Sequence, residues 1–112
     1  MATKKQRRMT FEKSSGNVFA DIGFANPERE QLKAHLTLQI YRIIKARDLT
    51  QLQAGEILGI KQPQVSLLLR NRSGTFSVER LMDFLTALGH DVEIRVKRTR
   101  KAHGQMSVVV AA

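Results

Sequence analysis

The sequence contains no cysteine among its 112 residues, so it forms neither a disulfide bond nor a zinc site with thiolate ligands. Its histidines, His35, His90 and His103, are scattered and match no metal-binding or catalytic spacing. It also lacks a paired carboxylate site, a phosphate-binding glycine loop and a nucleophile with a nearby base. We therefore expect a protein that is not an enzyme and that needs no metal or cofactor.

Long apolar segments are missing as well. The basic start, MATKKQRRM, is followed by the polar residues 10–17 and not by the apolar core of a signal peptide. No stretch approaches the roughly 20 apolar residues that a membrane-spanning helix needs. With the lack of cysteine, these absences lead us to expect a soluble cytoplasmic protein that does not bind membranes.

Acidic residues are in the minority, because 10 Asp and Glu oppose 19 Lys and Arg and give a net charge of +9. The excess lies at the two ends of the chain, since residues 1–20 and 92–112 each carry five basic residues and one acidic residue. Residues 47–91 carry five of each. A chain of this length holds one domain with tails, and its charge indicates an anionic partner such as nucleic acid.

The apolar periodicity predicts a mainly α domain. Asn26-Pro27-Glu28 is a strong helix start, and we expect a helix from Pro27 to about Arg47. Its buried stripe follows three- and four-residue steps: Leu32, Leu36, Ile40, Ile43 and Ile44. Ser77 caps another predicted helix over residues 78–88, whose stripe is Val78, Leu81, Met82, Leu85 and Leu88, with Phe84 alongside.

Residues 50–71, TQLQAGEILGIKQPQVSLLLRN, predict two short helices joined by a tight turn. Thr50 is a good N-cap, and Gly59 stands where the first helix stops, in a position that favours a left-handed backbone. Pro63 lies in the first turn of the second helix. In the second helix Val65, Leu68 and Leu69 face inward. Three polar side chains then face outward: Gln62, Gln64 and Ser66. Such a surface suits either the major groove of DNA or plain solvation.

This segment resembles the helix-turn-helix of the Cro/repressor family, also called the xenobiotic-response-element (XRE) family. The family pattern stands here as Thr50-Gln51, Ala54, Leu58-Gly59-Ile60, Gln62-Pro63-Gln64-Val65-Ser66 and Arg70. The flanking sequence FSVERLMDFLTALGHDVEIRV is similar to the antitoxin branch, whose best-known members are the HigA-type antitoxins. The resemblance covers about residues 17–97 and implies a lambda-repressor-like bundle of four to five helices.

The resemblance also implies how the protein would contact double-stranded operator DNA. Gln62 would contact an adenine edge in the major groove. Neighbouring base edges or phosphates would be contacted by Lys61, Gln64 and Ser66. Phosphate contacts, which fix the register of the protein on the duplex, would come from Gln51, Arg70 and Arg72.

Leu67 departs from the family pattern, which usually has a polar residue at this position. A helix cannot bury Leu67, Leu68 and Leu69 on one narrow stripe, so we expect one of them to be exposed. We expect it to be Leu67, facing either a thymine methyl group or another protein.

The apolar period changes to two at Val92, Ile94 and Val96, which predicts a half-buried β-strand. A single strand leaves backbone hydrogen-bonding groups unpaired, so it needs a partner. The partner is either the same strand of a second subunit, in a homodimer that binds two half-sites, or residues 108–110 of the same chain. The first is favoured. The expected organisation is a flexible basic arm at 1–16, the DNA-binding domain with its dimerisation strand at 17–97 and a basic tail at 98–112.

The sequence thus favours a dimeric DNA-binding transcriptional repressor, most simply the antitoxin of a toxin-antitoxin operon that represses its own promoter. One alternative is a protein inhibitor of a small ribonuclease toxin, with DNA binding secondary. Another is a phage-type or solo repressor. A small ribonuclease is a further alternative, but no His, Glu or Tyr constellation supports it.

Overall fold

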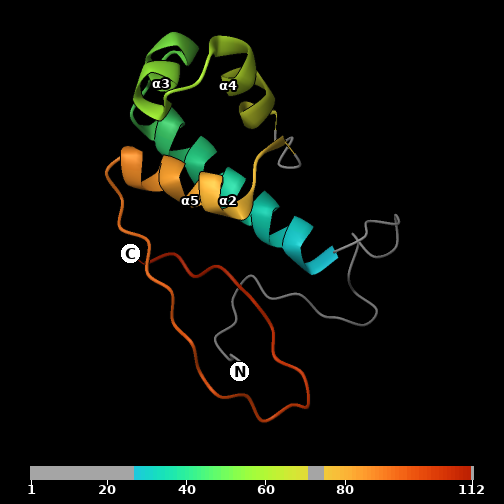
Figure 1. The fold of residues 1–112 in the computed structure, drawn as a ribbon. Coiled ribbons are helices and arrows are strands. Elements are labelled where there is room, and N and C mark those ends of the chain that lie inside the picture. The colour runs from blue at the N-terminus through green and yellow to red at the C-terminus, as the bar shows by residue number, and fades with distance from the viewer. Residues whose placement is uncertain (1–26, 71–74, 112) are drawn as a thin grey trace. The chain divides into compact units, whose positions relative to one another are not determined.

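The computed structural model describes residues 27–70 and 75–111, and within them the chain forms four helices and no strand (Figure 1). The helices are α2 (Pro27–Ala46), α3 (Gln51–Leu58), α4 (Gln62–Leu69) and α5 (Val78–Ala87). This confirms the prediction of a mainly α helix-turn-helix fold. The chain divides into two compact units: Lys33–Val92, and a second unit whose described residues are 27–32 and 93–111.

Helix α2 begins at Pro27, as predicted. Glu28 and Glu30 lie in its first turn and Lys45 in its last, where their charges interact favourably with the helix dipole. The expected cap, Asn26, lies outside the described residues. The buried stripe consists of Leu36, Ile40 and Ile44. Leu32 and Ile43, which were also predicted to be buried, are only half-buried.

Two polar residues of the same helix, Lys33 and Thr37, are also buried. Thr37 is fully buried, and its hydroxyl Oγ1 donates a hydrogen bond of 2.8 Å to the carbonyl of Lys33 in the preceding turn. Because the hydroxyl is satisfied within its own helix, the side chain is accommodated in an apolar setting without an unpaired donor.

Helix α5 begins at its predicted cap, since the Oγ of Ser77 accepts the backbone N–H of Arg80 at 3.0 Å. Leu81, Phe84 and Leu85 are buried, so Phe84 belongs to the core and not to its edge. The ring of Phe76 packs edge-on against that of Phe84, with centroids 5.1 Å apart.

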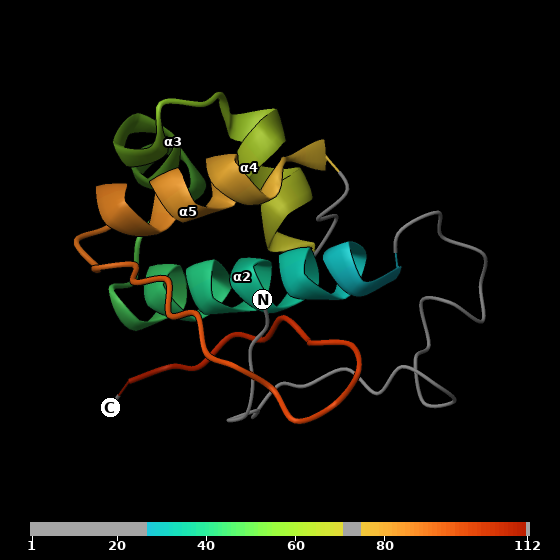
Figure 2. The ribbon, with the colours of Figure 1, turned by 60° about the horizontal axis from the view of Figure 1, so that its bottom comes forward.

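Figure 1 and Figure 2 both show α5 running alongside α2 in the same direction. Their C-terminal ends are joined by a hydrogen bond of 3.1 Å, which Arg47 Nη1 donates to the carbonyl of Leu88 at the end of α5. A cation at this place also suits the negative end of the α5 dipole. Helix α3 packs against both α4 and α5.

The described residues of the second unit include the C-terminal segment 93–111, which is extended and apolar at several exposed positions. Ile94 and Val96 are 77% and 74% exposed. Residues 92–96 and 108–110 form no strand in the described chain, so the predicted strand is not confirmed. Within this unit, the backbone N–H of Met106 donates to Glu28 Oε2 at 3.3 Å.

Among the helices of residues 27–70 and 75–111, none combines the length and apolar composition required to cross a bilayer. The same residues contain no group of three or more His, Cys, Asp or Glu side chains placed to hold a metal ion.

Candidate nucleic-acid interface

The start of α3 is fixed by a reciprocal pair of hydrogen bonds. Thr50 Oγ1 accepts the backbone N–H of Gln53 at 3.0 Å, and Gln53 Oε1 accepts the backbone N–H of Thr50 at 2.9 Å. This capping box satisfies two donors that an open helix end leaves without a partner. It also places Gln51 at the first position of the helix, as the sequence predicted.

The turn between α3 and α4 depends on two glycines. Gly59 has a φ of +74°, the left-handed conformation predicted for it, and its N–H donates to the carbonyl of Gly55 at 2.8 Å. The N–H of Ile60 donates to the same carbonyl at 3.0 Å. A Cβ atom on Gly55 would lie 2.7 Å from the carbonyl oxygen of Ile60, so no larger residue fits there without a backbone shift.

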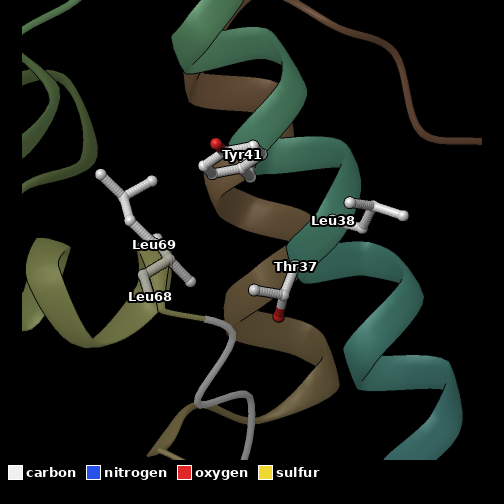
Figure 3. Close-up of a pocket in the computed structure, with 5 residues that line it drawn as sticks. All are labelled: Thr37, Leu38, Tyr41, Leu68 and Leu69. Atoms are coloured by element: carbon white, nitrogen blue, oxygen red, sulfur yellow. The ribbon is translucent and has the colours of Figure 1, made fainter.

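Apolar contacts then set α4 against the rest of its unit. Val65 and Leu68 are fully buried, as is Ala54 of α3. Figure 3 shows Leu68 and Leu69 at the end of α4, opposite Thr37 and Tyr41 of α2. These four residues and Leu38 line a hollow of about 220 Å³. The triple leucine is thus divided between the core and the surface, but Leu67 is half-buried like Leu69 and not exposed as expected.

The outward side of the α3–α4 pair carries the glutamines that the sequence singled out. Gln62, at the first position of α4, is exposed, and its Nε2 donates to Oε1 of Gln51 at 3.4 Å. The bond is long, but it joins the first residues of two helices. The fold thereby brings together Gln51 and Gln62, which are 11 residues apart in the chain.

Gln64 is held differently. Its side-chain Oε1 accepts the backbone N–H of Lys61 at 3.1 Å, and its own backbone N–H donates to the carbonyl of Lys61 at 2.9 Å. Both Lys61 and Gln64 are exposed. The side chain of Gln64 therefore serves as a cap for α4, a role that the sequence analysis did not assign to it.

At the other end of α4, Arg70 folds back onto Ser66. Its Nη2 donates to Ser66 Oγ at 3.2 Å and its Nε to the Ser66 carbonyl at 3.4 Å. Arg70 is exposed and Ser66 is half-buried. The remaining predicted contact residue, Arg72, lies outside the described residues.

The electrostatic character of this surface suits an anion. Neither α3 nor α4 has an acidic residue in its first turn, so the positive ends of both helix dipoles are left uncompensated. Lys61 and Arg70 add exposed positive charges at either end of α4. A third cation of the same unit, Arg80, instead lies over the ring of Phe84, 5.2 Å from its centroid.

Comparison with known proteins agrees with this geometry. Residues 18–97 match a family described as a helix-turn-helix domain. A solved structure of a protein designated an XRE family transcriptional regulator is 37% identical to this chain, with a TM-score of 0.69, and the match covers 78% of this chain and 98% of that one. The chain belongs to the XRE-type helix-turn-helix family. None of the curated proteins matches its sequence.

In this helix-turn-helix protein, sequence reasoning missed the capping roles of Gln53 and Gln64 and the close approach of another segment at Gly55. The signals were present. Thr50 and Gln53 have the three-residue spacing of a capping box, and Lys61 and Gln64 have the same spacing. Gly55 is an isolated glycine inside a helical pattern, which marks a close approach of another segment.

Proposed function

We propose that this chain is a sequence-specific DNA-binding transcriptional regulator that inserts the start of α4 into the major groove. The observation that carries the proposal is the hydrogen-bonded pair Gln51–Gln62 at the starts of two packed helices, neither of which has an acidic residue in its first turn. A surface built only for solvation has no need to fix two glutamines from different helices against each other.

In the proposed complex, Gln62 contacts an adenine. The bond to Gln51 uses one hydrogen of its Nε2, which leaves Oε1 and the second N–H for the adenine N6 and N7 positions. Gln51 and Arg70 contact phosphates and set the register, together with Arg72. Lys61 and Ser66 contact neighbouring base edges or phosphates, and Leu67 lies near the groove.

The proposed regulator acts as a homodimer. Two copies joined through Val92, Ile94 and Val96 would present two α4 helices to two half-sites, as helix-turn-helix dimers do. The large exposure of Ile94 and Val96 supports this arrangement, because a second strand would cover them and would pair their backbone groups.

The finer proposal is an antitoxin that represses its own promoter and binds a toxin protein. It is supported by the resemblance of FSVERLMDFLTALGHDVEIRV to HigA-type antitoxins. It predicts that the chain lowers expression from a reporter that carries its own upstream region. It also predicts that the chain restores growth to cells that express the neighbouring reading frame.

The DNA-binding proposal is tested with Gln62→Ala on a duplex from the protein's own promoter and on a scrambled duplex. We expect specific binding to weaken by about 1–3 kcal/mol while binding to the scrambled duplex stays nearly constant. Thr86→Ala truncates another exposed polar side chain, on α5, and serves as the matched control. Equal losses on both duplexes, or no loss on either, would rule out base contact by Gln62.

A further inference from the structure

The two outward glutamines of α4 are anchored by opposite ends of their side-chain amides. Gln62 is held through Nε2, which donates to Gln51, whereas Gln64 is held through Oε1, which accepts the backbone N–H of Lys61. A backbone N–H is always a donor, so the Gln64 atom that faces it must be the amide oxygen. The end of Gln64 that remains for a ligand is therefore its NH2 group.

This orientation limits which base Gln64 accepts. A glutamine contacts adenine with its oxygen and its nitrogen on the same base edge, because adenine presents a donor at N6 and an acceptor at N7. With its oxygen turned toward Lys61, the amide of Gln64 cannot present both atoms outward. Guanine presents two acceptors, O6 and N7, and the NH2 group has two hydrogens to give.

We propose that Gln64 is a specificity-determining residue that acts only as a hydrogen-bond donor and selects guanine, beside a Gln62 that selects adenine. The inference rests on the proposed DNA-binding function and deepens it. One short helix thereby carries two glutamines with different base preferences. The difference comes from the hydrogen bond that each side chain already makes within the protein.

The hydrogen bond to the Lys61 N–H keeps the NH2 group of Gln64 pointing outward. To contact adenine, the amide would have to leave the N–H of Lys61, and the start of α4 would then lose its side-chain cap. Contact with guanine needs no such change. The guanine complex is therefore formed with the conformation that the free protein already has.

Two substitutions test the roles of the Gln64 side-chain oxygen and nitrogen separately. Gln64→Glu keeps an oxygen to accept the N–H of Lys61 and removes the donor. Gln64→Lys keeps a donor that suits guanine and removes the oxygen. Both variants and the wild-type chain are used to select binding sites from a library of randomised DNA duplexes.

We expect the wild type to enrich a site with guanine at one defined position. Gln64→Glu should lose the discrimination for guanine at that position by roughly 5- to 150-fold and should turn toward cytosine, whose N4 donates to a carboxylate. Gln64→Lys should retain guanine there. Melting followed by circular dichroism should show Gln64→Glu folded like the wild type, and a fixed scrambled duplex measures the general effect of the changed charge.

Selection of adenine by the wild type at the position that Gln64→Glu alters would overturn the inference. So would an unchanged base preference at every position in Gln64→Glu. Both results leave the proposed function intact, because the wild type still enriches a defined site. A wild-type chain that enriches no sequence would overturn the proposed function, and the inference with it.

Discussion

The helix-turn-helix and the C-terminal segment 92–110 both carry a regular apolar pattern, yet within residues 27–70 and 75–111 only the first has its apolar side chains largely buried. In the helix-turn-helix, caps and turn hydrogen bonds close over three to five residues, and Ala54, Val65 and Leu68 are fully buried. In the C-terminal segment, Ile94 and Val96 remain largely exposed. Helical backbone groups find partners nearby in the sequence, whereas those of a strand need a second strand.

In the proposed dimer, the C-terminal segment is the part of the molecule that depends on association. The helical unit Lys33–Val92 has its own core, so it should fold in a single copy. The C-terminal segment would acquire its structure only when its apolar side chains and backbone groups meet a partner. Substitutions in the two regions should therefore act on different equilibria, namely the unfolding of the helices and the association of two chains.

The largest effect is expected from Ile94→Asp. In the proposed dimer this places a carboxylate without a partner in an apolar strand pair, which costs several kcal/mol. We expect a monomer in sedimentation experiments, with helices that melt nearly as in the wild type. Specific DNA affinity should fall about 10³-fold or more, toward non-specific binding, because one half-site offers few contacts.

Ile94→Val is the control for this experiment, since it keeps the apolar, β-branched character and should remain dimeric. If Ile94→Asp stays dimeric, segment 92–96 is not the dimer element. A monomeric Ile94→Asp that binds the promoter as tightly as the wild type would separate dimerisation from DNA recognition.

Gly55→Ala should lower the stability of the helix-turn-helix and leave the association of two chains unaffected. Its Cβ would lie 2.7 Å from the backbone oxygen of Ile60, and a backbone atom cannot move away as a flexible side chain does. Overpacking of this kind costs about 1–3 kcal/mol, partly offset by the gain of about 1 kcal/mol in helix propensity. We expect a net loss of up to about 2 kcal/mol in urea unfolding, with the dimer dissociation constant unchanged.

Glu56→Ala provides the matched control for that change, because it is exposed, lies on the same helix and also raises the helix propensity. It should leave the free energy of unfolding nearly unchanged. Unfolding of Gly55→Ala at or above the wild-type urea midpoint would mean that the turn adapts to a larger residue.

Thr50→Ala is expected to have a smaller effect, on the helix-turn-helix alone. It removes the oxygen that accepts the N–H of Gln53, and the loss of such a cap costs about 1 kcal/mol. Thr50→Ser retains the hydroxyl and should keep most of the stability. Thermal unfolding of both variants distinguishes the cap from general effects of the substitution, which would lower the melting temperature of both equally.

The local features of the helix-turn-helix could be predicted from the sequence because their causes are local. Thr50 and Ser77 cap the helices that they were expected to cap, and Gly59 has the left-handed backbone expected of it. Side chains with more than one role were harder to interpret. Gln64 was expected to face DNA, but its side-chain oxygen also accepts the N–H of Lys61, a second role that only its three-residue spacing from Lys61 indicates.

Packing beyond one helix was predicted less well. Ile43 was placed in the buried stripe but is half-buried, whereas Thr37 is buried, with its hydroxyl bonded to its own helix. For the C-terminal segment, alternation in the sequence indicates which residues share a face, but not which strand covers that face. This is why Val92, Ile94 and Val96 were recognised as a strand pattern and yet form no strand in the described chain.

The smallest expected effect concerns pH and belongs to the helical unit. Burial of His35 on α2 lowers the pKa of its imidazole below the ordinary value of 6.5, so the folded state favours the neutral form. Below pH 6.5 the unfolded chain binds the proton more readily, and the free energy of unfolding therefore falls as the pH drops toward the folded pKa. Urea unfolding at pH 7.5 and 5.5 should show this loss, and His35→Gln should reduce it. His35 should make no contribution to the pH dependence of the dimer dissociation constant. A dissociation constant that changes with pH in the wild type but not in His35→Gln would mean that unfolding and association are coupled through α2.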